Sequence, residues 1–507
     1  MATTPDKKTT SVENVVEPVD SVLVGDQKLH SDLSEDDAEL GVAAALREYV
    51  PGTTAEKRLV RKIDLVLLPT LWWLYILAYL DRGNVANAKA AGLSRDLNLN
   101  DNDYSLIISI FFVGYSIFEV PSNLLLNKFR PALYLSVIMA IWGACVAAMS
   151  SVKTSGHLLV GRFFLGFIEA GVFPGSLYLL TCWYKKEEVG KRFSIFYTSG
   201  CIAPALGGIM AGAILSRLEG AMGWPGWRWL FLIEGVVTVG FAVVFYFVLV
   251  DYPHTTKKFF SKEECQLAYV RVLHDRNTNA AQNNERLTPW QSVWAVLCDF
   301  KSYAFLVLYL LDSTATSISY FIPSTLTTMG YTSVTAQWMT VPIWVSGAII
   351  MVILSSSSDK FRERRWHITG SMIIGLICSI VTVTVDNVSA KYSMLCFYIG
   401  GIYSAIALIL NWTSESMALP DQKRSVALAF VNSFGNLSII WGSRLWISAE
   451  SPRYVTGFTA IGAMTGSAAL LSAAIPFLFK FLPKEPATKA ERELIRRRAE
   501  RENMETA

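Results

Sequence analysis

Residues 161–183, GRFFLGFIEAGVFPGSLYLLTCW, contain two charged side chains within a segment long enough to cross a bilayer. These are Arg162 and Glu169. A carboxylate at the centre of a bilayer costs at least about 2.5 kcal/mol, so Glu169 must face protein or water. It either forms a structural hydrogen bond between helices or serves as a proton or substrate site. Because ionisable groups within membrane spans are usually functional, we favour the proton or substrate site.

The adjacent residues Asp81 and Arg82 follow an apolar run, 63–80, that nearly spans a membrane by itself. The pair either forms an interfacial salt bridge or lies deeper, if the span continues through the small residues of NVANAKAAGL. We favour a functional role for this pair as well. Asp312 begins a polar stripe in the second half of the chain. It either lines the other wall of a cavity or joins neighbouring helices.

Three other acidic residues in the spans are interpreted as structural. Asp64 lies near the start of a helix, where a carboxylate complements the helix dipole. Glu119 and Glu234 are explained at least as well by bonds between helices or to lipid headgroups as by transport.

The composition identifies a polytopic membrane protein. Hydrophobic residues make up 52% of the chain, charged residues 17%, and the mean hydropathy is +0.36. Soluble domains carry about 25% charged residues. The net charge of +3 gives no reason to expect a nucleic-acid partner. The seven cysteines are scattered singly, and neither a nucleophile–base pair, a metal-binding pattern nor a phosphate loop is visible, so we expect no enzyme activity, cofactor or metal.

Hydropathy predicts an all-α protein with twelve transmembrane helices in two six-helix bundles. We divide the chain into a disordered cytoplasmic N-terminal tail (1–57), a first bundle (58–250), a cytoplasmic connector (251–301), a second bundle (302–482) and a charged cytoplasmic C-terminal tail (483–507). Ser261 and Glu264 have capping-box spacing and predict an amphipathic helix in the connector. The expected spans are 63–92, 105–126, 132–150, 157–182, 193–215, 229–250, 302–323, 338–356, 367–385, 392–412, 425–446 and 458–480.

The distribution of lysine and arginine predicts that both termini are cytoplasmic. The loops on the side of the termini hold most of these residues, among them Lys57, Arg130, Lys185 and Arg364, whereas the opposite loops hold few. The sequon at Asn387 falls in an outer loop and is a predicted glycosylation site. In a further span, SGCIAPALGGIMAGAI, closely spaced glycines allow another helix to approach, which is typical of a rocking element.

Several motifs together resemble the major facilitator superfamily, and within it the fungal allantoate permease branch of the anion:cation symporters. The resemblance covers about residues 58–485. The motifs are LDRGNVANAKAAGL (80–93), GRFFLGFIEAGVFPG (161–175), WYKKEEVGKR (183–192), GWRWLFLIEG (226–235), DYPHTTKKFFSKEE (251–264), SDKFRERR (358–365) and SPRYVTG (451–457).

The resemblance implies two six-helix bundles that open alternately to each side around a central cavity. It implies that Arg82 pairs with an anionic substrate and that Asp81 and Glu169 are the protonatable carboxylates. Arg162 matches the family's fourth-helix arginine. SDKFRERR, with Asp359, Arg362 and Arg365, resembles the second copy of a cytoplasmic gating loop. The first copy, NKFRPAL, lacks the usual acidic residue, so we expect an asymmetric gate.

The leading hypothesis is a monomeric fungal plasma-membrane transporter that imports a small organic anion, such as a carboxylate or vitamin-like nutrient, together with protons. A vacuolar or other internal membrane is the alternative location. Efflux of an acidic secondary metabolite and nutrient sensing without transport are the alternative functions. Substrate contacts are expected from Arg82, Asp312 and Asn411. Further cavity-lining candidates are Tyr178, Tyr197, Tyr309, Tyr320 and Trp344.

Overall fold

The computed structural model describes residues 45–46, 48–126, 129–281, 287–417, 421–481 and 486–506. Most of the predicted disordered tail, 1–57, lies outside these residues. The described residues form helices and connecting loops, with no strand among them. The all-α prediction is therefore confirmed.

The first half contains six membrane-spanning segments. Ordered along the chain they are α4 (Thr54–Ala90), α6 (Asp101–Leu126), α7 (Pro131–Met149), α8 (Ser155–Glu169) with α9 (Val172–Trp183), α10 (Lys186–Tyr197) with α11 (Ser199–Leu218), and α12 (Gly226–Val248). Short α5 (Leu93–Asp96) and η1 (Ala221–Gly223) lie in loops. The fourth and fifth spans, predicted as single helices, are each divided in two.

The second half repeats this plan after the connector helix α13 (Lys262–Ala281) and α14 (Pro289–Cys298). Its spans are α15 (Phe300–Ala315) with η2 (Thr316–Tyr320) and α16 (Ile322–Thr328), α17 (Ser333–Phe361), α18 (Arg365–Thr384), α19 (Val388–Ser416), α20 (Asp421–Asn436) with α21 (Ile439–Gly442), and α22 (Val455–Phe481). Turns η3 (Ser443–Leu445) and η4 (Ser448–Glu450) precede α22. The C-terminal tail contains a helix, α23 (Lys489–Thr506).

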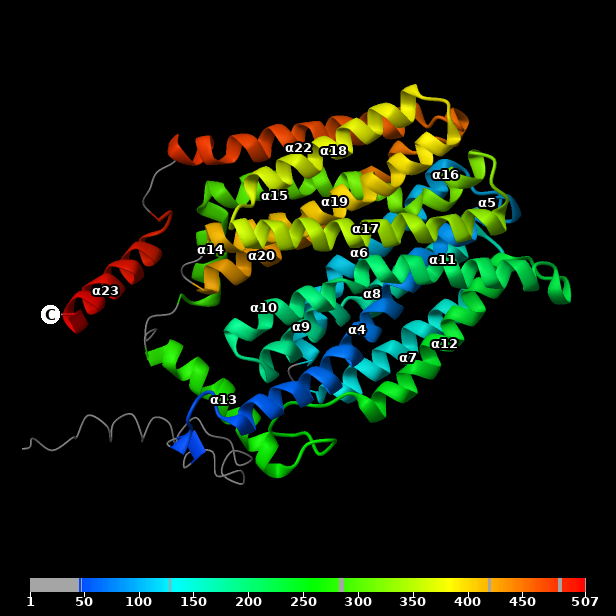
Figure 1. Cartoon of the computed structure of the whole chain (residues 1–507). Coiled ribbons are helices and arrows are strands. Elements are labelled where there is room, and N and C mark those ends of the chain that lie inside the picture. The colour runs from blue at the N-terminus through cyan, green and yellow to red at the C-terminus, as the bar shows by residue number, and fades with distance from the viewer. Residues whose placement is uncertain are drawn as a thin grey trace, which may run out of the picture.

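Twelve segments thus occupy membrane-spanning positions. Ten described helices are long and apolar enough to cross a bilayer, and the bent pair Trp290–Cys298 and Phe300–Tyr320, at 76°, supplies an eleventh. Helix α6, with 26 residues, fills the remaining position. Figure 1 shows the helices of the two halves as two neighbouring groups, with α13 and α23 at the same end of the molecule. We call this the inner end, following the predicted orientation, and the opposite end the outer end.

The connector helix α13 is attached to the first bundle. The predicted capping box is confirmed, because the Ser261 N–H donates to Glu264 Oε2 (2.9 Å) and the Glu264 N–H to Ser261 Oγ (3.2 Å). Glu264 also accepts from Lys62 of α4 (2.7 Å). Arg271 of α13, fully buried, pairs with Glu188. Helix α13 therefore lies against the inner end of the first bundle.

The two bundles meet at the outer end. There α4 and α6 of the first bundle pack against α16, α21, η2 and η3 of the second, and α11 packs along α17. Tyr104 donates to the carbonyl oxygen of Tyr320 (2.9 Å), and Gln337 to that of Asn87 (3.1 Å). The inner-half helices α9, α10 and α20 pack mainly within their own bundles. The molecule is therefore closed at the outer end and parted at the inner end.

Candidate substrate cavity and its charged groups

Arg82 and Glu169 form a buried ion pair at the centre of the first bundle. Arg82 Nε lies 2.5 Å from Glu169 Oε1, with the Arg82 side chain 12% exposed and that of Glu169 fully buried. One nitrogen and one oxygen of this pair, Arg82 Nη2 and Glu169 Oε2, are buried and have no hydrogen-bond partner. A buried polar atom without a partner costs about 1–3 kcal/mol, so this pair has unused capacity to bind a polar ligand.

Asp81 and Arg82 do not form the interfacial salt bridge that was one reading of the sequence. Helix α4 continues past them to Ala90, which places both inside the protein. Asp81 is 1% exposed and faces the first bundle, where its Oδ2 accepts hydrogen bonds from Trp142 Nε1 (2.8 Å) and Thr238 Oγ1 (3.1 Å). Its Oδ1 has no partner. Arg82, the next residue on the helix, faces Glu169 instead.

Arg162 is fully buried and holds the backbone of α4 at this point. Its Nη1 and Nη2 donate long hydrogen bonds, both 3.4 Å, to the carbonyl oxygens of Asp81 and Arg82. The aromatic ring of Phe111 lies between the two guanidinium groups, 5.4 Å from that of Arg82 and 5.0 Å from that of Arg162. Arg162 is thus a positioning residue, because it contacts the backbone that carries the pair.

Two glycines allow the close packing that places Phe111. A Cβ atom on Gly166 would collide with the carbonyl oxygen of Phe111, and one on Gly114 with the carbonyl oxygen of Phe163. Helices α6 and α8 therefore approach each other at a distance that only glycine permits at these positions. The GRFFLGFIE segment supplies Arg162, Glu169 and the glycine that brings α6 against them.

A cavity between the bundles adjoins Arg82 and has two lobes. The lobe toward the outer end takes in about 570 Å³ of empty space and the other about 770 Å³, counting the solvent at their mouths. Both lobes are lined by Tyr79, Arg82, Ser319, Tyr320 and Tyr403. Arg82 is the charged residue common to both among the described residues, so a ligand crossing from one lobe to the other passes its guanidinium.

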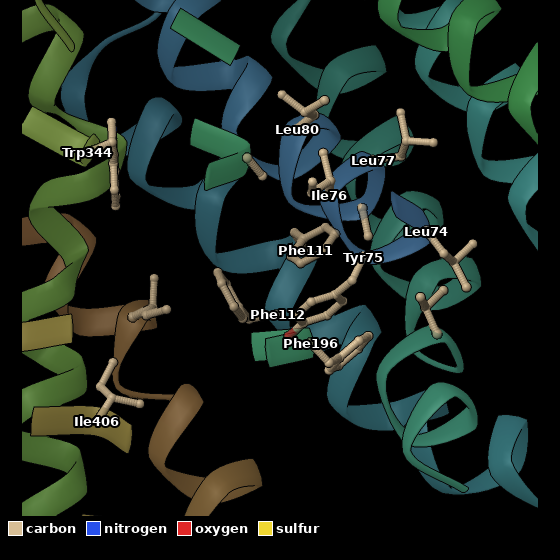
Figure 2. Packing of buried hydrophobic residues seen from close by; sticks show 14 of the residues in the cluster. Leu74, Tyr75, Ile76, Leu77, Leu80, Phe111, Phe112, Phe196, Trp344 and Ile406 are labelled. Atoms are coloured by element: carbon tan, nitrogen blue, oxygen red, sulfur yellow. The ribbon is translucent and has the colours of Figure 1, made fainter. Parts of the chain in front are cut away.

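Aromatic and hydroxyl side chains from both bundles line the rest of the larger lobe. Seven tyrosines contribute to it: Tyr75, Tyr79, Tyr115, Tyr197, Tyr309, Tyr320 and Tyr403. Figure 2 shows Tyr75 and Phe112 of the first half across from Trp344 and Ile406 of the second. The predicted lining residues Tyr197, Tyr309, Tyr320 and Trp344 all line one of the lobes. The lining offers stacking surfaces and hydroxyl donors to a ligand.

Three predicted residues do not line this cavity. Asn411 has an exposed side chain on α19, and Tyr178 is 38% exposed beside Tyr252. Asp312 is fully buried within the second bundle, and neither of its carboxylate oxygens has a partner, whereas its neighbours Ser313 and Thr316 do line the larger lobe. The face of a helix on which a single polar residue lies decides its exposure, and hydropathy alone left that face undetermined for each of the three.

The inner end carries ion pairs near the predicted gating loop. Arg364 pairs with Asp359 (2.5 Å) and with Glu415 of α19 (3.0 Å). Arg365 donates to the carbonyl oxygen of Ala473 on α22 (2.6 Å), and Arg362 ends α17 in a left-handed conformation. Of the predicted gating residues, Asp359 and Arg365 make contacts across elements, whereas the arginine that links α17 to α19 is Arg364.

In the first half, Asp251 supplies the acidic group that NKFRPAL lacks. It is 1% exposed and accepts from Arg130 Nη2 (2.7 Å) and from the Ala132 N–H (3.0 Å). The first-half loop thus takes its acidic partner from beyond α12, whereas the second-half loop contains its own, and the asymmetric gate stays a prediction.

Sequence reasoning missed the donors to Asp81 and the position of Glu234. Trp142 and Thr238 gave no signal, because a tryptophan and a threonine in a span are ordinary helix-packing residues. Glu234, interpreted as structural, is buried near Asp81 without a hydrogen-bond partner. Asn387, the predicted glycosylation site, accepts from the Ala390 N–H (3.2 Å) and caps α19, and glycosylation there stays a prediction.

Comparison with known proteins gives the same assignment as the fold. Residues 71–443 match the family model described as Major Facilitator Superfamily. The MFS-type transporter cnsO of Penicillium expansum is 34% identical over 82% of this chain and 83% of its own length. A high-affinity nicotinic acid transporter of Saccharomyces cerevisiae is 30% identical over 81% of this chain and 75% of its own.

A solved structure supports the same fold. The bacterial homolog of the human lysosomal transporter Spinster, in an inward-facing and unoccupied conformation, aligns with a TM-score of 0.65 at 14% identity, covering 84% of this chain and 97% of its own. Twelve spans in two bundles, a central cavity and these similarities lead to one assignment: the chain is a transporter-type membrane protein that belongs to the major facilitator superfamily.

Proposed function

We propose that this protein imports a small organic anion together with protons, by alternating access, and that Arg82 binds the negative group of the substrate. The observation that carries the proposal is the free Nη2 of a guanidinium that lines both lobes of the cavity. A carboxylate placed there would form a charge-assisted hydrogen bond in a site shielded from water. Such a bond is stronger than one between neutral groups.

Glu169 gives this site a means of coupling to protons. It competes with any incoming anion for Arg82, since the two side chains already form an ion pair. Protonation of Glu169 removes its negative charge and releases the guanidinium for the substrate. Anion binding and proton binding then favour each other, as linkage requires.

The charge balance around Arg162 supports a proton site. Arg82 and Arg162 are the cations of this buried group, and Asp81, Glu169 and Glu234 are carboxyl groups within it, with Glu119 also within electrostatic reach of Arg82. Buried charges are costly unless paired, so this excess of carboxyl groups over guanidinium groups is balanced only when carboxyl groups carry protons. Asp81 and Glu169 are the candidates we favour, because Glu169 pairs with Arg82 and Asp81 precedes Arg82 on α4.

The tyrosine-rich lining favours a planar or aromatic carboxylate over an aliphatic one. Stacked aromatic groups contribute about 0.5–1.5 kcal/mol beyond the area that they bury. The name of the nicotinic acid transporter gives one candidate of this chemistry, and the motifs that resemble the allantoate permease branch of the anion:cation symporters support an anionic substrate. We propose that the protein works as a monomer in the plasma membrane.

Energetics set what such a carrier can achieve. A monoanion entering with one proton is electroneutral and responds to the pH gradient alone, about 1.36 kcal/mol per pH unit. With two protons the complex carries one positive charge, and a membrane potential of 100 mV contributes about 2.3 kcal/mol more. The dependence of accumulation on membrane potential therefore separates one proton from two.

The test is uptake in yeast that lacks its own carriers. Labelled nicotinate, pantothenate, biotin, allantoate and short carboxylates are supplied at acidic and at neutral pH. The variants are Glu169→Gln and a matched control, Asp312→Asn, which replaces a buried carboxyl group of the second bundle that lacks an arginine partner. We expect acid-stimulated accumulation of one anion, loss of the acid stimulation in Glu169→Gln, and acid stimulation retained in Asp312→Asn.

Two results would change this conclusion. Uptake that Glu169→Gln leaves equally sensitive to pH would remove Glu169 from the coupling. No accumulation of any anion, in protein shown to reach the cell surface, would refute import of this panel and favour efflux of an acidic metabolite or nutrient sensing.

A further inference from the structure

A second, separate cavity opens at the outer end, above the contact between the bundles. It encloses about 1210 Å³ of empty space. Both bundles contribute to its lining, which carries hydroxyl groups on most sides. We call it the outer vestibule, and its polar lining residues are Lys89, Ser94, Arg95, Glu219, Ser324, Thr327, Thr328, Ser333, Ser448, Ser451 and Tyr454.

The charges in and near the outer vestibule are unevenly matched. Arg95 lies beside Asp96 (3.7 Å), and Glu219 accepts a hydrogen bond from the Gly226 N–H (2.9 Å). Asp101, near Lys89, accepts from Ser448 through both its backbone N–H (2.7 Å) and its hydroxyl (2.5 Å). Lys89 has no hydrogen bond or ion pair within the described residues, so its ammonium is the cation left without a direct anionic partner.

Two aromatic rings hold Lys89 in place. Its Nζ lies 3.9 Å from the ring centroid of Tyr104 and 4.9 Å from that of Phe321. Tyr104 belongs to α6 of the first bundle and Phe321 to the second. Such contacts satisfy the charge of an ammonium group but use few of its N–H donors. When the bundles part at the outer end, Phe321 moves away with the second bundle and Lys89 becomes open to the outside.

Lys89 lies on the same side of α4 as Arg82. The two residues are seven positions apart, which is two helical turns and about 10 Å along the axis. Gly83, Ala86 and Asn87, between them in the sequence, line the outer lobe of the cavity. A stripe along α4 therefore runs from the outer vestibule to Arg82 with a cation at each end.

We propose that the outer vestibule is a second anion-binding site, in which Lys89 receives a carboxylate from outside before it reaches Arg82. The ammonium supplies the charge, and the surrounding serine and threonine hydroxyl groups donate to the carboxylate oxygens. Transport of an anion is taken from the proposed function, but the positive charge that Lys89 adds to the outer vestibule does not depend on it. The two can therefore be tested separately.

The test measures the contribution of Lys89 to the local potential with a cysteine placed in the outer vestibule by Thr327→Cys. In intact cells, its reaction rates with an anionic and a cationic impermeant methanethiosulfonate reagent are compared. Because Lys89 and residue 327 line the same cavity, removing the lysine charge at physiological salt should lower the anion-to-cation rate ratio about threefold. We expect this decrease for Lys89→Met and no decrease for Lys89→Arg. The matched control is Lys153→Met, which removes an exposed outer lysine that does not line the vestibule.

Equal rate ratios in Lys89→Met and Lys153→Met would overturn the proposal. Concentrated salt provides a check that needs no change at Lys89, because it should lower the ratio of the Thr327→Cys protein toward that of Lys89→Met. A ratio insensitive to salt would also overturn it. In uptake, Lys89→Met should raise the external KM for nicotinate about threefold and preserve the maximal rate. If the unmodified protein carries no nicotinate, the proposed function fails for that anion. The rate ratio still tests whether Lys89 attracts anions to the outer vestibule.

Discussion

Gly208 on α11 provides a way to perturb the contact between the bundles. A Cβ atom at this position would collide with Thr340 Oγ1 and lie 2.8 Å from the carbonyl oxygen of Gln337, both on α17. The threonine side chain can rotate, but the backbone carbonyl group cannot move without its helix. Gly208→Ala should therefore push α17 away from α11. Because this contact belongs to the closed outer end, the substitution should destabilise the inward-open state relative to the outward-open state.

Overpacking by a single methyl group costs about 1–3 kcal/mol when the neighbour is rigid. If the outward-open state relieves the collision, the ratio of outward-open to inward-open molecules rises by the same free energy, about 5- to 150-fold. Gly240→Ala is the matched control. Gly240 lies within α12, and a Cβ atom there would have no neighbour within 4 Å. Both substitutions increase helix propensity alike, so their difference isolates the contact between α11 and α17.

The assay measures access from outside to a cysteine introduced by Ala86→Cys. Ala86 is 3% exposed and lines the outer lobe beneath the closed contact. An impermeant thiol reagent should label it 5- to 150-fold faster when Gly208→Ala is added, after the labelling of the native cysteines is subtracted. Equal labelling with Gly208→Ala and Gly240→Ala would refute the reasoning, since it would mean that α11 absorbs the collision within its own bundle.

Three further predictions concern the inner end of the molecule. Asp251→Asn should lower the free energy of unfolding by about 2–3 kcal/mol, because the buried carboxylate accepts hydrogen bonds from Arg130 and from a backbone N–H. The control, Asp386→Asn, removes an exposed ion pair and should cost less than about 1 kcal/mol. Thermal unfolding of both variants in detergent measures the difference. Lys423 donates to Glu491 of α23 (2.7 Å) and to Asp299, which caps α15 (2.6 Å), so it ties α23 to the second bundle. Lys423→Met should therefore speed trypsin cleavage of α23. Unchanged cleavage would contradict this role. Burial alone would raise the pKa of Glu264. Hydrogen bonds from Lys62 and from the backbone N–H of Ser261 lower it by more than burial raises it, so the pKa lies below its ordinary value of 4.5. The resulting stability is complete above pH of about 4.5 and lost as the pH falls through that lowered pKa. Because the intrinsic rate of amide exchange itself falls toward acidic pH, the measured quantity is the protection factor of α13 at each pH. This factor should drop at acidic pH in the unmodified protein and show no such step in Glu264→Gln.

The arrangement of helices could be predicted because the bilayer imposes a length and a composition on every span. The positions at which a helix breaks within a span could not be predicted in this way. Helices α8 and α9 separate near Ala170 and Gly171, and α15 passes through η2 before α16. Such breaks depend on neighbours that satisfy the freed backbone groups, and those neighbours come from distant parts of the chain.

The candidate site likewise contains residues that the sequence predicted and residues that it did not. Arg82, Glu169 and Arg162 were predicted to be important because charges in apolar spans are costly, and the structure brings all three together. Asn411 was predicted to contact the substrate, but its side chain lies outside the cavity. Hydropathy does not determine which face of a helix lines a cavity. Lys89, near the end of the predicted span 63–92, was not among the predicted site residues, and the structure places it between two aromatic rings.

The two halves share a packing plan but differ in charge, and this difference bears on how the carrier moves. In the first half α7 meets α12 at Gly143 and Gly235, and in the second α18 meets α22 where Gly375 faces Thr465. Only the first half places an arginine at the cavity among the described residues, while within the second no cation pairs with buried Asp312. We therefore infer that the substrate's negative group stays with the first bundle in both conformations. The second bundle then supplies a neutral wall of tyrosine and hydroxyl groups that can rock past the substrate without breaking an ion pair.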